Sequence, residues 1–129
     1  MLWAAFRRPV LRSMYSSTFV FASHQLDEAF HQLYAEITKV AEGLPGFRGA
    51  ESWENSGTGL VSKVFYWASL EDLQQLMVHP SHLRAKAAHE QWLAGYQVVI
   101  AKVMRVYGDT RLDAVLPLNA KAFKKDQRE

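Results

Sequence analysis

Five histidines and no cysteine set the chemistry open to this sequence, because disulfides, thiolate metal sites and cysteine nucleophiles are all absent. His79 and His82 are three residues apart and would share a helix face, but Pro80 stands between them. His82 and His89 are seven residues apart, about 10.5 Å along a helix, which is too far for one ion. We therefore expect no metal site. Proton transfer remains, because an imidazole with a pKa near 6.5 can accept a proton at neutral pH.

Large aromatic residues could form the walls of a pocket for a ring-shaped ligand. The candidates for this substrate-binding role are Trp53, Tyr66, Trp67, Trp92 and Tyr96. Buried Tyr and Trp side chains usually find a hydrogen-bond partner for their polar atom. Packing in the core or in a dimer explains the same residues equally well, since large aromatics dominate both cores and interfaces.

Length and composition are those of one globular domain. The chain has 129 residues, 49% of them hydrophobic, and can bury a core without disulfide bonds. The net charge is only +2, which does not imply a nucleic-acid partner. The residues before Pro9 lack the continuous apolar stretch of a secretory signal, and no segment approaches the roughly 18 apolar residues of a membrane span. We expect a cytoplasmic protein with no membrane partner.

Patterns of apolar and turn residues predict the element order β-α-β-β-α-β. The strands are recognised as short β-branched and aromatic runs, and a loop of Asn, Ser, Gly and Thr between the second and third is typical of a β-hairpin. The four predicted strands are Thr18–Ser23, Phe47–Glu54, Leu60–Trp67 and Gln97–Tyr107.

The helices are predicted from apolar stripes and end signals. An apolar stripe between Leu26 and Leu44, with spacings of three and four, indicates a first helix that Gly43 and Pro45 bring to an end. In the second helical region, Ser69 and Asp72 have the spacing of a capping box, and Pro80 interrupts the helix. The inward-facing residues after the cap are Leu70, Leu73, Leu76 and Met77, and a further helical stretch runs from Ser81 to about Leu93.

This order is that of the ferredoxin-like split βαβ unit, an α+β fold with both helices on one face of a four-stranded antiparallel sheet. The uncovered face of such a sheet should be polar. Here the alternate positions of two strands are apolar on both faces: Val99, Ala101 and Val103 against Val98, Ile100 and Met104, and Leu60, Val64 and Tyr66 against Val61, Phe65 and Trp67. The simplest cover for the second face is another copy of the sheet, so we predict a homodimer.

Four segments carry a resemblance to a known family: LPGFRGAESWE, VFYWASLEDLQQL, HPSHLRA and GYQVVIAKVMRVYG. Over about residues 17–108 the chain resembles the antibiotic biosynthesis monooxygenase (ABM) domain, in particular its small haem-degrading-monooxygenase-like bacterial branch. The matching positions are Pro45, Gly46 and Phe47, Tyr66 and Trp67, Glu71, His82, and Trp92 and Tyr96. The resemblance divides the chain into an N-terminal extension (1–16), an ABM-like domain (17–109) and a C-terminal tail (110–129).

The resemblance implies a dimeric α+β barrel with a pocket between sheet and helices in each subunit. Members similar to this chain include cofactor-independent oxygenases of aromatic polyketides or quinols, and haem-degrading enzymes. The haem-degrading members use a first-strand asparagine, a helix tryptophan and an iron-ligating helix histidine. Here the asparagines are Asn55 and Asn119, and Leu76 and Lys86 stand at the other two positions. We therefore expect no cofactor, and haem binding is the weakest alternative.

By this resemblance His82 is the catalytic proton acceptor of a monooxygenase that takes a small apolar or aromatic molecule. A metal-free oxygenase needs a dry pocket and a base that converts the substrate to an electron-rich anion. The structural alternative is that His82 caps or packs the helix after Pro80. The functional alternative is a non-catalytic dimeric ligand-binding or stress-associated domain, which would bind an apolar ligand without turnover.

Overall fold

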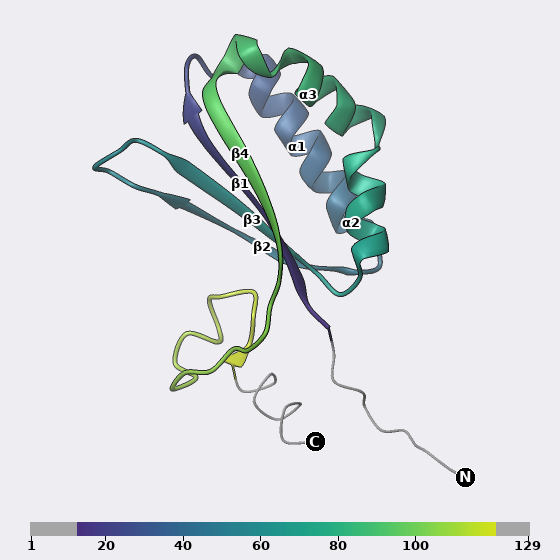
Figure 1. Cartoon of the computed structure of the whole chain (residues 1–129), viewed down its shortest axis with the longest axis vertical. Coiled ribbons are helices and arrows are strands. Elements are labelled where there is room, and N and C mark those ends of the chain that lie inside the picture. The colour runs from purple at the N-terminus through teal and green to yellow at the C-terminus, as the bar shows by residue number, and fades with distance from the viewer. Residues whose placement is uncertain (1–12, 121–129) are drawn as a thin grey trace.

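The computed structural model describes residues 13–120, which form a four-stranded antiparallel sheet with the helices on one of its faces (Figure 1). The strand order is β2-β3-β1-β4. The elements are β1 (Tyr15–Ser23), α1 (Glu28–Glu42), β2 (Phe47–Glu54), β3 (Val61–Trp67), α2 (Leu70–Met77), α3 (Pro80–Trp92) and β4 (Leu93–Lys102). This arrangement confirms the predicted α+β, ferredoxin-like βαββαβ fold, with the second helical region divided at Pro80.

The strand register assigns each side chain to one of two faces. Phe19 of β1 stands opposite Lys63 of β3 and Val98 of β4, and these share the face beneath the helices, called the covered face below. Neighbouring residues of a strand point to opposite faces. The other face, called the open face, carries Ser16, Thr18, Val20, Glu51, Trp53, Ser62, Val64, Tyr66, Gln97, Val99 and Ala101.

Helix α1 follows its sequence signals closely. The Asp27 side chain accepts a hydrogen bond of 3.0 Å from the Phe30 backbone amide and so caps the first turn. Phe30 and Ile37 are buried on the apolar stripe, and Gly43 is the C-terminal cap. The predicted amphipathic helix is therefore confirmed.

Helix α2 begins with the predicted cap but does not form the predicted capping box. The Ser69 hydroxyl accepts from the Asp72 amide at 3.1 Å. The Asp72 carboxylate instead accepts from the Gly46 amide at 2.6 Å, which ties α2 to the start of β2. Leu73 and Leu76 are buried as expected, whereas Leu70, the first residue of the helix, is 44% exposed. The prediction that Leu70 faces inward is wrong, because α2 packs into the core through Leu73, Leu76 and Met77.

The limits of β1 and β4 differ from the predicted ones because they depend on pairing with the neighbouring strands. β1 begins at Tyr15 rather than Thr18, because the residues before Thr18 pair with both neighbouring strands. β4 spans Leu93–Lys102 rather than 97–107, because α3 passes into it without a turn and Lys102 is opposite the first residue of β1. Within the described residues the pairing ends one residue further on, where the Val103 amide donates to the Met14 carbonyl oxygen at 2.7 Å.

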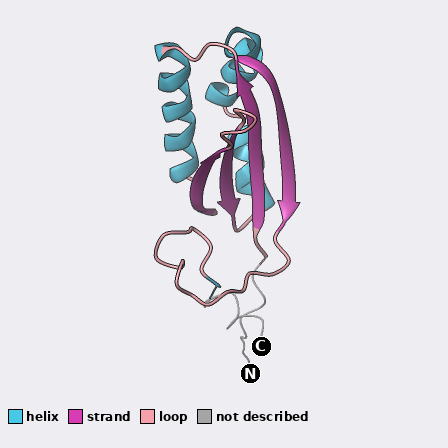
Figure 2. Cartoon of the chain, turned by 90° about the vertical axis from the view of Figure 1, so that its left-hand side faces the viewer, coloured by secondary structure: helices cyan, strands magenta, loops and turns pink. Residues whose placement is uncertain are grey.

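Residues 103–120 leave the sheet and lie beyond its end, where β4 finishes (Figure 2). Pro117 packs against Gly49, which belongs to the bulge near the start of β2. Gly49 has a φ of +123°, and a Cβ atom there would come within 2.8 Å of the Pro117 Cβ, so glycine is required on both counts. The charged residues from 121 onward, and those before residue 13, lie outside the described part of the chain.

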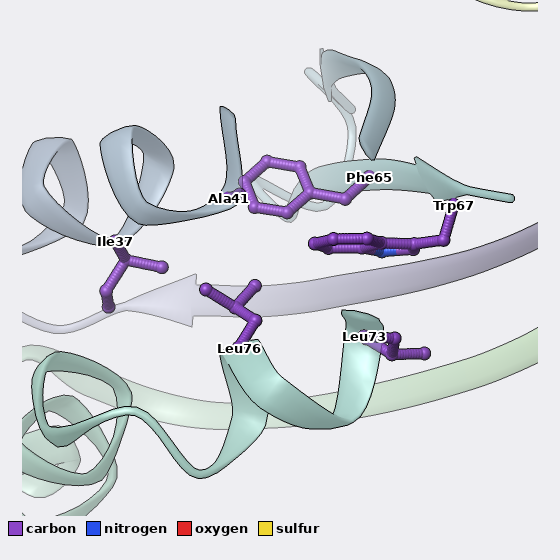
Figure 3. Packing of buried hydrophobic residues seen from close by; sticks show 6 residues of the cluster. All are labelled: Ile37, Ala41, Phe65, Trp67, Leu73 and Leu76. Carbon is purple, nitrogen blue, oxygen red and sulfur yellow. The ribbon is translucent and has the colours of Figure 1, made fainter. Parts of the chain in front are cut away.

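The core beneath the helices forms two clusters. One surrounds Trp67, whose ring is fully buried against Phe47 and Phe65, with ring centroids 5.5 and 6.2 Å away. In Figure 3 Leu76 points from α2 toward this ring and toward Ile37 of α1. The second cluster consists of Phe21, Phe30, Trp92 and Leu93. The candidate site lies along both clusters.

Candidate functional site

A cavity of about 310 Å³ lies between the covered face of the sheet and the three helices. Its size is at the low end of the range for small-molecule sites. The walls are mainly apolar, as such sites usually are. They include Phe19, Phe30, Leu33, Ile37, Phe65, Leu73, Leu76, Met77, Trp92 and Val98.

One face of α3 supplies three polar residues of the lining. His82, Lys86 and His89 all line the cavity, and their spacings of four and three place them in one row along the helix. Trp92, three residues further on, continues the row. The periodicity of α3 therefore brings two imidazoles and an ammonium group into the same apolar space.

His82 is positioned there by the break between α2 and α3. His79 is the N-cap of α3, and its Nδ1 accepts from the Ser81 amide at 3.1 Å. Pro80 occupies the first turn, where a missing amide hydrogen costs nothing. The cap of α3 is thus His79 and not His82, which leaves the His82 ring to face the cavity.

The environment of His82 keeps its imidazole neutral. Burial lowers the pKa of His82 below 6.5, the nearby Lys86 ammonium lowers it further, and a hydrogen bond with the Met77 backbone acts in the opposite direction. Its Nδ1 is buried and has no hydrogen-bond partner among residues 13–120. A neutral ring with an unused nitrogen in an apolar cavity can accept a proton at pH 7.

Trp92 and Tyr96 also line the cavity, as the pocket interpretation expects. Trp92 is 6% exposed, and its ring meets Phe30 edge-on at 5.6 Å. Its Nε1 is the second buried polar atom without a partner in the described chain. Tyr96 packs edge-on against His89, with ring centroids 5.0 Å apart. Buried polar atoms are almost always paired, so the two exceptions indicate a place where a ligand or water binds.

Trp67 does not line the cavity but supports its floor. Its Nε1 donates a hydrogen bond of 3.2 Å to Ser17 Oγ, and Ser17 is part of the lining. Trp67 itself belongs to the core (Figure 3).

Tyr66 and Trp53 lie on the open face, away from the cavity. Trp53 is 54% exposed, and its Nε1 donates to Glu51 Oε2 at 2.9 Å. Burial, the Glu51 charge and a hydrogen bond to Glu51 raise the pKa of Tyr66 to about 12. The structure therefore separates the five predicted pocket aromatics, and brings only Trp92 and Tyr96 together with His82 in the cavity.

Sequence reasoning missed Lys63, Tyr34 and His89 as lining residues, and considered Lys86 only as a departure from a haem site. The signals were present. Lys63 alternates with Val61 and Phe65 in a strand whose inward positions are apolar, and His89 falls in the row of α3 that starts at His82. The His89 Nδ1 lies 2.8 Å from the Lys86 carbonyl oxygen, which can only accept, so Nδ1 carries the hydrogen and Nε2 is the open nitrogen.

Within residues 13–120 no group of three or more His, Asp or Glu side chains could hold a metal ion. In the same part of the chain, no helix is both long and apolar enough to cross a membrane.

No protein-family model matches this sequence, and no curated protein sequence matches it. Solved structures do. SnoaB, a cofactor-independent oxygenase from Streptomyces nogalater, aligns with a TM-score of 0.58 at 10% identity over 74% of this chain and 96% of that chain. A candidate antibiotic biosynthesis monooxygenase from Caulobacter crescentus aligns with a TM-score of 0.56 at 20% identity over 74% and 92% of the two chains.

A third structure, a Dabb-family protein with a ferredoxin-like fold from Mesorhizobium loti, aligns with a TM-score of 0.51 at 12% identity over 69% of this chain and 95% of that one. The structural neighbours are thus ABM-type and dimeric α+β barrel proteins. At these identities the likeness establishes the fold alone. It does not establish an activity, because one fold hosts many activities.

Proposed function

We propose that this protein is a cofactor-independent monooxygenase that oxidises a small aromatic, quinol or polyketide-like substrate in the cavity between the sheet and the helices. The observation that carries the proposal is His82, a neutral imidazole whose buried Nδ1 has no partner within residues 13–120 and which lines a mainly apolar cavity. The fold shared with SnoaB supports the same reaction class.

In this proposal His82 removes a proton from a ring CH₂ group beside a carbonyl, or from a ring hydroxyl. The resulting anion is electron-rich and reduces O₂ directly. With a CH₂ substrate, one oxygen atom forms a bond to the ring carbon as a hydroperoxide. Loss of water from that group leaves a carbonyl, so that CH₂ and O₂ give C=O and H₂O. The apolar walls keep bulk water from the anion, and His82 returns its proton to the departing oxygen.

The test is O₂ uptake by chelator-treated protein with two probes, 2-tetralone as an enolizable ring and 1,4-naphthalenediol as a quinol. We expect uptake above the uncatalysed rate, and with ¹⁸O₂ one labelled atom in the tetralone product and the other in water. Uptake that disappears with chelation and returns with added metal would contradict the proposal. Saturable binding of both probes with no oxidation would instead favour the ligand-binding alternative.

The pH at which activity is lost on acidification should depend on Lys86. His82 must be neutral to accept a proton, so activity falls as the pH drops through the pKa of His82. Lys86 lowers that pKa, and Lys86→Met should therefore raise it and move the loss of activity to higher pH. An NMR titration of the His82 ring measures the shift without turnover. Lys39→Met, an exposed residue of α1, should leave the titration unchanged, and an equal change in both variants contradicts the assignment.

We also propose that the open face binds a second copy of this chain. Val99 and Trp53 leave 43% and 54% of their surfaces exposed on that face. Val20 lies in the same cross-strand row as Trp53, with Ser62 between them, and diagonally beside Val99. A sheet face with apolar side chains needs a cover. The Dabb-family fold of a structural neighbour supports a two-fold partner as that cover.

Val99→Glu should dissociate this dimer. A two-fold axis places the new carboxylate in the interface twice, and each burial without a partner is costly, so we expect the dimer to weaken by about 100-fold or more. Sedimentation equilibrium over a range of protein concentrations measures the change. Val78→Glu, at a position 64% exposed at the end of α2, is the control that should remain dimeric. An unmodified protein that sediments as a monomer would contradict the proposed dimer.

A further inference from the structure

The charged side chains that line the cavity are both cationic. Lys63 and Lys86 line it together with His82 and His89. The cavity-lining residues include no Asp or Glu within the described part of the chain. A small apolar site with two ammonium groups and no carboxylate has a positive potential, which focuses anions into it.

Lys63 is the most informative of these residues because of where it lies. It occupies a covered-face position of the central strand β3, where its neighbours on the same face are Val61 and Phe65. Its cross-strand neighbours are Phe19 on β1 and the exposed Ser52 on β2. Its side chain is half-buried, and Nζ lies 5.0 Å from the centre of the Tyr34 ring. A cation–π contact of this kind returns only part of the free energy lost when an ammonium group leaves water.

No carboxylate of residues 13–120 pairs with Lys63. Glu36 of α1 forms its ion pair with Arg84 of α3, at 2.7 Å. A lysine inside the covered face therefore has a ring beside it and no counterion. A half-buried ammonium group on the cavity wall is therefore available to an anion that enters from solution.

The unpartnered indole of Trp92 points to the same kind of ligand. An indole N–H can only donate, and so can a lysine ammonium group. Trp92 Nε1 is buried without an acceptor in the described chain, in a cavity whose charged residues are also donors. The lining thus complements a ligand that brings acceptor oxygens and negative charge on an apolar body.

We propose that the cavity binds an aromatic ring system carrying an oxyanion, a carboxylate or an ionised ring oxygen, and that Lys63 binds this oxyanion, with Lys86 and Trp92 as the further donors. The inference rests on the proposed function for the place of the site and narrows its substrate class. In the oxygenase reaction, an ammonium group that donates a hydrogen bond to the ring oxygen stabilises the same anion that reduces O₂.

The experiment compares two probes that share a ring and differ in charge, 2-naphthoate and 2-naphthylmethanol, by calorimetric titration. The unmodified protein should bind the naphthoate at least about tenfold more tightly than the alcohol, as expected of a charge-assisted hydrogen bond. Lys63→Met should lower naphthoate affinity by about tenfold or more and change alcohol affinity by less than about threefold. Lys39→Met makes the same change of net charge outside the cavity and should change neither affinity.

Equal affinity for the two probes, no saturable naphthoate binding, or an equal loss of both probes in Lys63→Met overturns the inference. Should Lys63→Met fail to fold, Lys63→Gln removes the charge and keeps a polar side chain. A third probe, 2-naphthol, separates the two oxyanion sources. If bound 2-naphthol shows the absorbance of its ionised form, and the Lys63 variant does not, Lys63 binds a ring oxygen. If the unmodified protein shows no such absorbance, Lys63 binds a carboxylate.

The outcome is independent of turnover, because neither 2-naphthoate nor 2-naphthylmethanol has to be oxidised. Charge-selective binding without O₂ uptake on any probe supports the oxyanion site and refutes the oxygenase. Incorporation of ¹⁸O from O₂ into 2-tetralone without charge-selective binding supports the oxygenase and refutes the oxyanion site.

Discussion

Replacing His82 by glutamine is expected to reduce substrate-dependent O₂ uptake by about 100-fold, because general-base catalysis by a positioned side chain contributes on this order. Glutamine is close to histidine in size and keeps a polar group in the cavity, but it cannot take up a proton. The buried Nδ1 of His82 has no partner among residues 13–120, so the substitution breaks no side-chain hydrogen bond at that atom. The loss should appear in kcat with the far-ultraviolet circular dichroism unchanged.

His31→Gln is the matched control for this result. His31 is exposed on α1 and does not line the cavity, so this variant should retain the full rate. An unchanged rate in His82→Gln removes His82 from the mechanism. His89→Gln then becomes the decisive variant, since the His89 Nε2 is the other open imidazole nitrogen of the row.

Replacing Trp67 by alanine should cause a large loss of stability. Trp67 is fully buried, packs against Phe47 and Phe65, and donates to Ser17. Removing a buried tryptophan costs about 3–5 kcal/mol, and here the Ser17 hydroxyl also loses its donor. Since domains of this size have a total free energy of unfolding of about 5–15 kcal/mol, this loss is a large share of the total, and the variant should unfold at a much lower urea concentration.

Urea denaturation at one fixed protein concentration measures this effect. The control is Leu83→Ala on α3, where the side chain is 50% exposed and the expected change is within about 1 kcal/mol. A Trp67→Ala protein that unfolds at the same urea concentration as the control would show that the cluster around Trp67 does not hold the sheet to the helices.

Most of the fold could be predicted from the sequence because its local signals agree with its tertiary structure. The Ser69 cap, Gly43 at the end of α1 and the loop between β2 and β3 each have one favoured local structure, and all three are observed. The outer ends of β1 and β4 could not be predicted. Their lengths are set by which strand lies alongside, and that information is not local to either segment.

The candidate site was less predictable, and Tyr66 and Trp67 show why. Adjacent residues of a strand point to opposite faces, so these two could never line one cavity together. Which of them faces the helices depends on the register of β3 with β1 and β2. The role of Asp72 was equally hidden, because its partner Gly46 is 26 residues away in sequence. A charged residue at an inward strand position, as at Lys63, is the signal to search for.

The central claim is that the cavity beneath the helices receives the ligand, and the indole N–H signals of the protein test it most directly. A ¹H–¹⁵N NMR titration with 2-naphthoate compares Trp92 in the cavity, Trp67 in the core beneath it and Trp53 on the open face, with assignments from single Trp→Phe variants. We predict the largest shift for Trp92, whose Nε1 gains an acceptor, and little change for Trp53. A shift of Trp53 with Trp92 unmoved would place the ligand on the open face and contradict the account.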